Sequence, residues 1–152
     1  MSDKEKLISN MQIIVTHLSQ LADGHLIQSR IFRSMGLTKL EKKYAEHAEE
    51  ERGYVIQMID RILDLGGDVK LEAKQAGAIF KDPVEWVKFD LQVSIDGLNL
   101  LKGMLEDAKD DVTTYDILKE YYKDEEEDMY WGEQQLELIE CIGVQNWILQ
   151  QL

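Results

Sequence analysis

Residues 66–83 read GGDVKLEAKQAGAIFKDP, and this stretch decides how the rest of the chain is connected. It begins with two adjacent glycines, which are typical of a helix end. It closes with Asp82 and Pro83, a capping carboxylate followed by a proline suited to the first turn of a new helix. Pro83 is the only proline of the chain, and apolar residues recur on both sides at spacings of three and four. The stretch therefore predicts a long connection between two helical parts.

Four long helices are predicted, two on each side of this connection, and a short amphipathic segment follows them. The long helices cover about residues 3–35, 38–65, 82–108 and 110–143, and the short segment covers residues 144–152. Gly36 and Gly143 are typical helix terminators, while Asp110 or Asp111 is expected to cap the fourth helix. Short turns join the helices within each pair, so the chain is expected to form two helical hairpins.

Two helical hairpins joined by one long crossover are the arrangement of ferritin-like folds among four-helix bundles. The predicted fold class is therefore all-α: a ferritin-like antiparallel four-helix bundle with one long crossover and a short C-terminal fifth helix. A length of 152 residues suits a single domain that spans the whole chain.

The composition narrows the classes of function. The chain has 17 basic and 30 acidic residues, and its net charge of -13 repels phosphates and anionic lipid but attracts cations. No run approaches the roughly 18 consecutive apolar residues of a membrane span, and the first residues show no apolar signal core. The single cysteine, Cys141, predicts no intrachain disulfide. We expect an unprocessed cytoplasmic protein that binds neither nucleic acid nor membrane.

Polar residues interrupt the inward stripe of each long helix near its centre. They are His25 on the first helix, His47 and Glu51 on the second, Ser94 on the third, and Glu125 with Asp128 on the fourth. Buried carboxylates are unfavourable unless they are paired, and in such bundles a cation shared by Glu and His residues is the usual compensation. These residues are therefore candidate metal ligands.

Each candidate also has an interpretation without metal. Glu51 can pair with Arg52 or with a lysine at a subunit contact, and Glu125 can turn outward into solvent. A histidine such as His25, alone on an apolar stripe, is more typical of a hydrogen-bonded core residue than of a ligand. The acidic neighbours of His47 leave both interpretations open for that residue.

Several blocks of the sequence resemble the bacterioferritin family. They are RIFRSMGL at 30–37, IDRILDLGG at 59–67, Asp90-Leu91 with Asp96-Gly97, Asp124-Glu125-Glu126, Trp131, Glu133, Leu138-Ile139, Gly143 and Asn146-Trp147. The resemblance covers nearly the whole chain and needs essentially no gap across residues 30–60. It implies a role in iron storage and iron homeostasis.

The resemblance also implies a ligand pattern. In the family, two irons are bridged by a glutamate from the second helix and one from the fourth, with further glutamates on the first and third helices and a histidine after each bridging residue. The bridging positions match Glu51 and Glu125. The remaining positions hold Leu18, Tyr54, Ser94 and Asp128. A degenerate ferroxidase centre is implied, with at most one divalent ion on Glu51, Glu125 and Asp128, joined by His25 or His47.

Two further family features can be compared with the chain. The family binds haem through a methionine of the second helix, a position held here by Arg52, so haem is not expected; Met58 is expected in the core. A carboxylate and imidazole group on the inner cage wall is matched by Glu46, His47 and Glu50. These residues are expected either to contact iron and nucleate mineral or to form an ordinary charged helix face.

The resemblance implies an iron-storage or iron-handling subunit that binds Fe(II) and Fe(III) and has weak or absent ferroxidase activity. The expected assembly is a homo-oligomeric 24-mer cage, or a cage mixed with a ferroxidase-competent subunit. Trp147, Ile148 and Leu152 are expected to point outward into subunit contacts. Two other functions remain open: an oxidase in which His25 and Tyr54 replace the missing ligands, and a metal-free structural subunit of a mixed cage.

Overall fold

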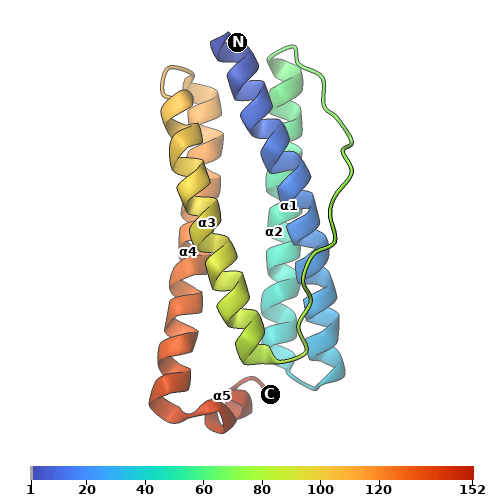
Figure 1. Ribbon diagram of the computed structural model, residues 1–152, viewed down its shortest axis with the longest axis vertical. Helices are drawn as coiled ribbons and strands as arrows, with labels where there is room; N and C mark the ends of the chain where they lie inside the picture. The colour runs from blue at the N-terminus through green and yellow to red at the C-terminus, as the bar shows by residue number, and fades with distance from the viewer. Residues whose placement is uncertain (1) are drawn as a thin grey trace.

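The computed structural model describes residues 2–152 as four long helices and one short helix (Figure 1). The elements are α1 (Asp3–Ser34), α2 (Thr38–Asp64), α3 (Pro83–Asp107), α4 (Val112–Ile142) and α5 (Val144–Gln150). Helices α1 and α2 form one hairpin and α3 and α4 the other, while the segment between α2 and α3 runs along the bundle beside α1 (Figure 1). The predicted fold class is confirmed.

The helix ends follow the sequence signals closely. The Asp82 carboxylate accepts hydrogen bonds from two backbone N–H groups in the first turn of α3. Asp111, rather than Asp110, caps α4 in the same way. Glycines with positive φ, where an L side chain is strained, lie just after three helices: Gly36, Gly66 and Gly143.

Two apolar clusters fill the bundle, one toward each end. The first contains Leu18 and Met58, and the second contains Phe32 and Tyr44. Burying each such side chain contributes roughly 1.5–3 kcal/mol. The predicted core position of Met58 is confirmed, because its side chain is fully buried. Buried polar residues lie between the clusters on all four long helices, and they include His25, His47, Glu51, Ser94 and Glu125.

Two expectations for the C-terminal part are wrong. Trp147 does not point outward: it is 0% exposed and belongs to the second apolar cluster, because α5 folds back onto its own bundle. Ile148 is also partly buried against that cluster, and only Leu152 is exposed as expected.

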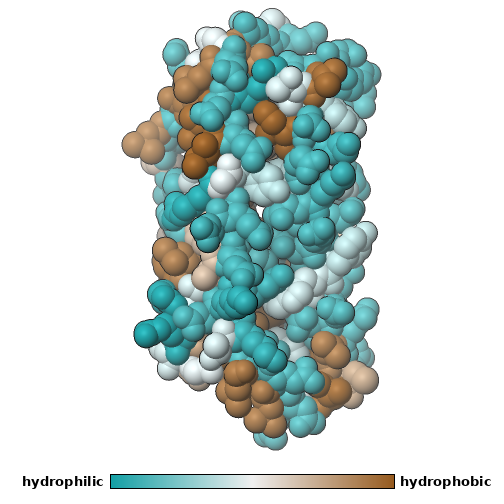
Figure 2. Space-filling model, turned by 180° about the vertical axis from the view of Figure 1, so that it is seen from behind, coloured by the Kyte–Doolittle hydropathy of each residue, from teal (hydrophilic) through white to brown (hydrophobic). Residues whose placement is uncertain are grey.

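The surface in Figure 2 is largely hydrophilic, and its apolar residues gather toward the two ends of the bundle. Exposed apolar side chains at the α5 end are Val144, Leu149 and Leu152. Leu63 near the end of α2 and Val112 at the start of α4 are exposed at the other end. Among residues 2–152, no helix has the length and apolarity needed to cross a membrane.

Candidate metal centre

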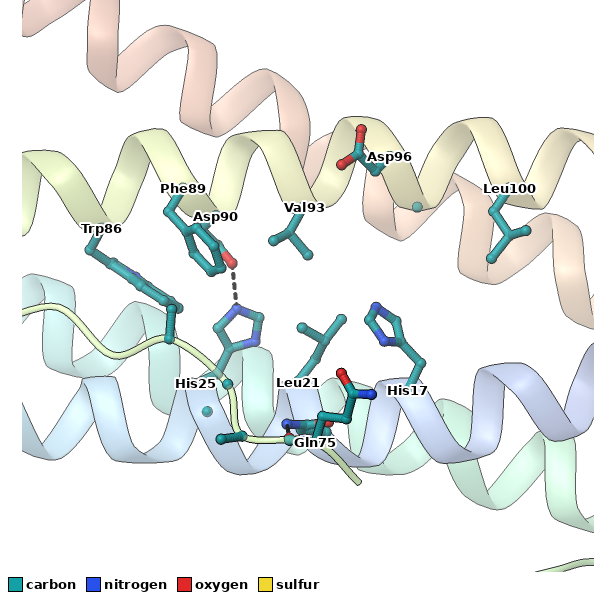
Figure 3. Close-up of a pocket in the computed structure, with 16 residues that line it drawn as sticks. His17, Leu21, His25, Gln75, Trp86, Phe89, Asp90, Val93, Asp96 and Leu100 are labelled. Carbon is teal, nitrogen blue, oxygen red and sulfur yellow. Dashed lines mark hydrogen bonds and ion pairs between the residues drawn. The ribbon is translucent and has the colours of Figure 1, made fainter. Parts of the chain in front are cut away.

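His25 on α1 connects two other helices through its imidazole ring. Nδ1 is hydrogen-bonded to the Glu51 carboxylate of α2, and Nε2 lies 2.7 Å from Asp90 Oδ1 of α3. Figure 3 shows His25 and Asp90 pointing toward each other across the space between α1 and α3. Burial lowers the pKa of His25, but the charges and hydrogen bonds of Asp90 and Glu51 outweigh it and raise the pKa well above 6.5. Without a metal, His25 is therefore an imidazolium between two carboxyl groups.

His47 lies one helical turn before Glu51 on α2 and is 4% exposed. Its Nε2 atom is 3.2 Å from Asp128 Oδ1 of α4, yet the angle between the groups is not that of a hydrogen bond. Burial, the nearby His25 charge and Lys43 lower the pKa of His47 to about 3. This imidazole is neutral at physiological pH, so one of its ring nitrogens carries a lone pair.

The α4 carboxyl groups hold protons more tightly than isolated carboxyl groups do. Burial, followed by repulsion from Glu125 and Asp124, raises the pKa of Asp128 to about 9. Burial is also the main reason that the pKa of Glu125 rises to about 7, although the nearby Ser94 lowers it somewhat. A cation in this layer would offset the repulsion and displace these protons.

The sequence analysis missed Asp90 as a site residue and used it only as part of a family block. One potential ligand atom from each of His25, His47 and Asp90 lies within 4.8 Å of the other two. The Asp90 side chain is 13% exposed and comes from α3. The spacing of four residues between Asp90 and the inward Ser94 is a signal that was available, since it places both on one helix face.

A pocket of about 460 Å³ opens between α1, α3 and the crossover segment (Figure 3). His25 and Asp90 line it together with apolar side chains such as Leu21, Phe89 and Val93. Water and ions from solvent can therefore reach the His25–Asp90 pair through this pocket.

Known proteins are similar to this chain in sequence. A model of the ferritin-like domain matches residues 8–142. A bacterial ferritin of Neisseria meningitidis serogroup B is 37% identical over 152 residues, covering 93% of this chain and 97% of that relative. The chain belongs to the ferritin family. A Pseudomonas aeruginosa bacterial ferritin is 30% identical over 155 residues, covering 100% of both chains, and a Rhodobacter capsulatus bacterioferritin is 29% identical over 125 residues, covering 81% of this chain and 78% of that relative.

Leu18 and Tyr54, which the family resemblance matches to a glutamate and a histidine ligand position, both lie in apolar packing. Leu18 is 1% exposed within the first apolar cluster. Tyr54 packs on that cluster, and its ring is tilted by 45° against that of Tyr121, with 5.2 Å between the ring centroids. Neither side chain supplies the carboxylate or imidazole of the family pattern. Glu51 and Glu125, at the positions matched to the bridging glutamates, therefore have no metal ligand from Leu18 or Tyr54.

Two interpretations of the carboxylates without metal are wrong: the pairing of Glu51 with Arg52 and the outward position of Glu125. Glu51 is 4% exposed and is bound by His25, whereas Arg52 is on the surface and pairs with Asp23 at 2.5 Å. Glu125 does not turn outward, because it is 7% exposed.

The candidate cage-wall residues are not brought together. Glu46 and Glu50 are exposed on α2, while His47 between them in sequence faces the bundle interior. Consecutive residues of a helix point about 100° apart, so His47 does not share the face of Glu46 and Glu50. The two surface carboxylates therefore lack the imidazole of the family's wall group.

Proposed function

We propose that this ferritin is an iron-storage or iron-handling cage subunit with a degenerate ferroxidase centre. Membership of the ferritin family supports the storage role. The observation that carries the finer proposal is the contact between His25 and Glu51. A glutamate that bridges two irons uses both its oxygens, and here one of them is hydrogen-bonded to His25 Nδ1. Fe(II) oxidation by this subunit alone should therefore be weak or absent.

The surface chemistry is consistent with iron as cargo. A net charge of -13 attracts Fe(II), and the exposed carboxylates of Glu46 and Glu50 suit Fe(II) and Fe(III) as hard oxygen ligands. We place the protein in the cytoplasm on the basis of its single cysteine. Haem is not part of the proposal, because the Arg52 guanidinium cannot ligate iron.

The proposed assembly is a closed cage of the 24-mer kind. Homo-oligomers and cages mixed with a ferroxidase-competent subunit both suit a chain whose own centre is incomplete. The exposed apolar residues at both ends of the bundle support subunit contacts, because a monomer would leave them in water.

Oxygen consumption after addition of two Fe(II) per subunit tests the degenerate centre. We expect the unmodified protein to oxidise this iron slowly. A variant carrying Leu18→Glu, Tyr54→His, Ser94→Glu and Asp128→His restores the ligand types of the family pattern and should oxidise two Fe(II) per subunit rapidly. Circular dichroism must first show that the variant folds, since Leu18 lies in the core. Rapid two-iron oxidation by the unmodified chain would show that the proposal is wrong.

The two alternative functions give different results in related measurements. An oxidase that uses His25 and Tyr54 is less favoured, because Tyr54 packs beside Tyr121 whereas His25 is held between Glu51 and Asp90. Such an oxidase would turn over Fe(II) in stopped-flow experiments. A metal-free structural subunit would retain no iron after anaerobic Fe(II) loading and gel filtration, whereas a storage subunit would retain it.

A further inference from the structure

We infer that His25, His47 and Asp90 form a mononuclear site for a first-row divalent transition-metal ion such as Zn(II) or Fe(II). None of these three residues occupies a ligand position of the family's di-iron pattern, and they come from α1, α2 and α3. The site goes beyond iron storage, because a subunit that deposits no mineral can still hold one ion here.

The ligand types and their spacing suit such an ion. Two imidazoles and one carboxylate bind Fe(II), Zn(II) and related metals and leave positions open for water. The three ligand atoms lie within 4.8 Å of one another, and His25 Nε2 and Asp90 Oδ1 are only 2.7 Å apart. Ligand atoms around a tetrahedral ion at about 2.1 Å are roughly 3.4 Å apart. Side-chain rotations that shorten the widest ligand–ligand distance by about an ångström and a half bring the three atoms to this spacing.

Glu51 orients the first imidazole. Because the Glu51 carboxylate accepts the hydrogen bond of His25 Nδ1–H, the opposite nitrogen, Nε2, is the one that faces Asp90. A carboxylate behind a metal-binding histidine fixes its tautomer and makes it a better ligand. The ion would take the place of the hydrogen now shared by His25 Nε2 and Asp90, and one proton would leave. Glu51 thus has a positioning role that differs from the bridging role of the family pattern.

Unpaired polar atoms gather around the same place. His47 Nε2, Tyr44 Oη and Trp86 Nε1 are buried, and none forms a hydrogen bond with the residues that the structure describes. The rings are close together: the centroids of His25 and His47 are 5.6 Å apart, those of His25 and Trp86 5.7 Å, and those of Tyr44 and Trp86 5.6 Å. Buried polar groups are nearly always paired. An ion bound through His47 Nε2 gives this atom the partner that it lacks.

The pocket of Figure 3 provides access. His25 and Asp90 line it, so an ion from solvent can reach them without separation of the helices. His47 lies outside the pocket lining, with its ring edge-on to His25. The open coordination positions of the ion therefore face a space of about 460 Å³ that admits water and other small ligands.

Anaerobic titration of the assembled protein with Co(II) tests the inference, since Co(II) reports its coordination through visible absorption. We expect one Co(II) per subunit, displaced by Zn(II). Asp90→Asn and His47→Gln should each weaken binding by more than about a hundredfold, and Glu51→Gln by about ten- to a hundredfold. Matched controls are His17→Gln and Asp96→Asn, which change an exposed histidine of α1 and an exposed aspartate of α3 that line the same pocket. Both controls should bind Co(II) like the unmodified protein.

Several results would overturn the inference. Binding that survives His47→Gln and is lost in Glu125→Gln would place the ion at the bridging carboxylates. Zn K-edge absorption of the unmodified protein, which needs no variant to fold, should show two imidazoles and an oxygen shell; fewer than two imidazoles would exclude the site. Uptake of iron by the unmodified cage tests the storage function separately, because its failure does not change the Co(II) stoichiometry.

Discussion

A single histidine side chain redistributes the charges in the middle of this bundle. His25 binds Glu51 and Asp90, so those two carboxyl groups have a cationic partner from another helix. The α4 acids Glu125 and Asp128 have none as close, and their pKa values rise to about 7 and about 9. Burial raises the pKa of Glu51 as well, and there the His25 charge opposes the rise. The polar layer thus has carboxyl groups paired with His25 on one side and acids with raised pKa values and no such partner on α4.

Asp128 should make the metal-free protein less stable as the pH rises from 7 to 9. Folding raises the pKa of this carboxyl group from 3.8 to about 9, so in this range the folded state holds a proton that the unfolded chain has lost. Raising the pH therefore favours unfolding, by at most about 1.4 kcal/mol per pH unit for one group. We expect the melting temperature in EDTA to fall over this range, and Asp128→Asn to reduce the fall.

Other titratable groups determine how much of the pH dependence of the melting temperature remains in Asp128→Asn. The raised pKa of His25 acts with the same sign, because its proton also stays bound in the folded state, so part of the slope persists in Asp128→Asn. The lowered pKa of His47 acts with the opposite sign, and its effect fades above about pH 7.5 as the unfolded imidazole, with a pKa of 6.5, also becomes neutral. Asp116→Asn, an exposed position on the same helix, should keep the full slope. Equal slopes in the Asp128 and Asp116 variants would contradict the prediction.

At the scale of the helices, local sequence signals were sufficient to predict where each helix begins and ends. Caps and glycines lie next to the ends that they determine, so the helix limits and the crossover could be predicted within a few residues. Helical periodicity also placed His25, His47 and Glu51 on inward faces. Which carboxylate each imidazole meets depends on the axial offset between helices, and periodicity does not give this offset. Periodicity could place Asp90 on the face of Ser94, but it could not place Asp90 opposite His25.

The burial of Trp147 depends in the same way on tertiary structure. Helix α5 turns back after Gly143, and the Gln151 carbonyl accepts a hydrogen bond of 3.0 Å from the backbone N–H of Lys39 in the α2 hairpin. The apolar character of Trp147 was clear from the sequence, but an outward and an inward position looked alike, because a helix of only seven residues has little periodicity.

Trp147 should therefore contribute to the stability of the subunit itself. Its indole N–H donates to Gln135 Oε1 at 2.9 Å, and its ring is fully buried. We expect Trp147→Ala to lower the free energy of unfolding by about 3–5 kcal/mol in urea, and Trp147→Phe, which loses the hydrogen bond but keeps a ring, by about 1–3 kcal/mol. Leu149→Ala is the control, since this side chain is 63% exposed. An unchanged unfolding midpoint for Trp147→Ala would contradict the packing of α5.

At the scale of the whole molecule, charge and apolar surface act in opposite directions. A net charge of -13 keeps copies of the chain apart, while the exposed Val144, Leu149 and Leu152 at one end and Leu63 and Val112 at the other favour contacts (Figure 2). Apolar patches at both ends allow each copy to touch several neighbours, and closed symmetrical assemblies are the usual outcome for such contacts. A closed assembly would take these patches out of water.

Sedimentation at micromolar concentration should therefore show one large species. A cage of 24 subunits of 17.6 kDa has a mass of about 422 kDa (24 × 17.6). We expect the combined change Leu149→Glu and Leu152→Glu to shift the protein to smaller species, because it places two charges in a contact that excludes water. Gln145→Glu, which adds a charge at an exposed polar position of the same helix, should preserve the large species. A monomer in the unmodified protein would contradict the cage, whereas a full-size cage in the double variant would show that the contacts near α5 are not needed for closure.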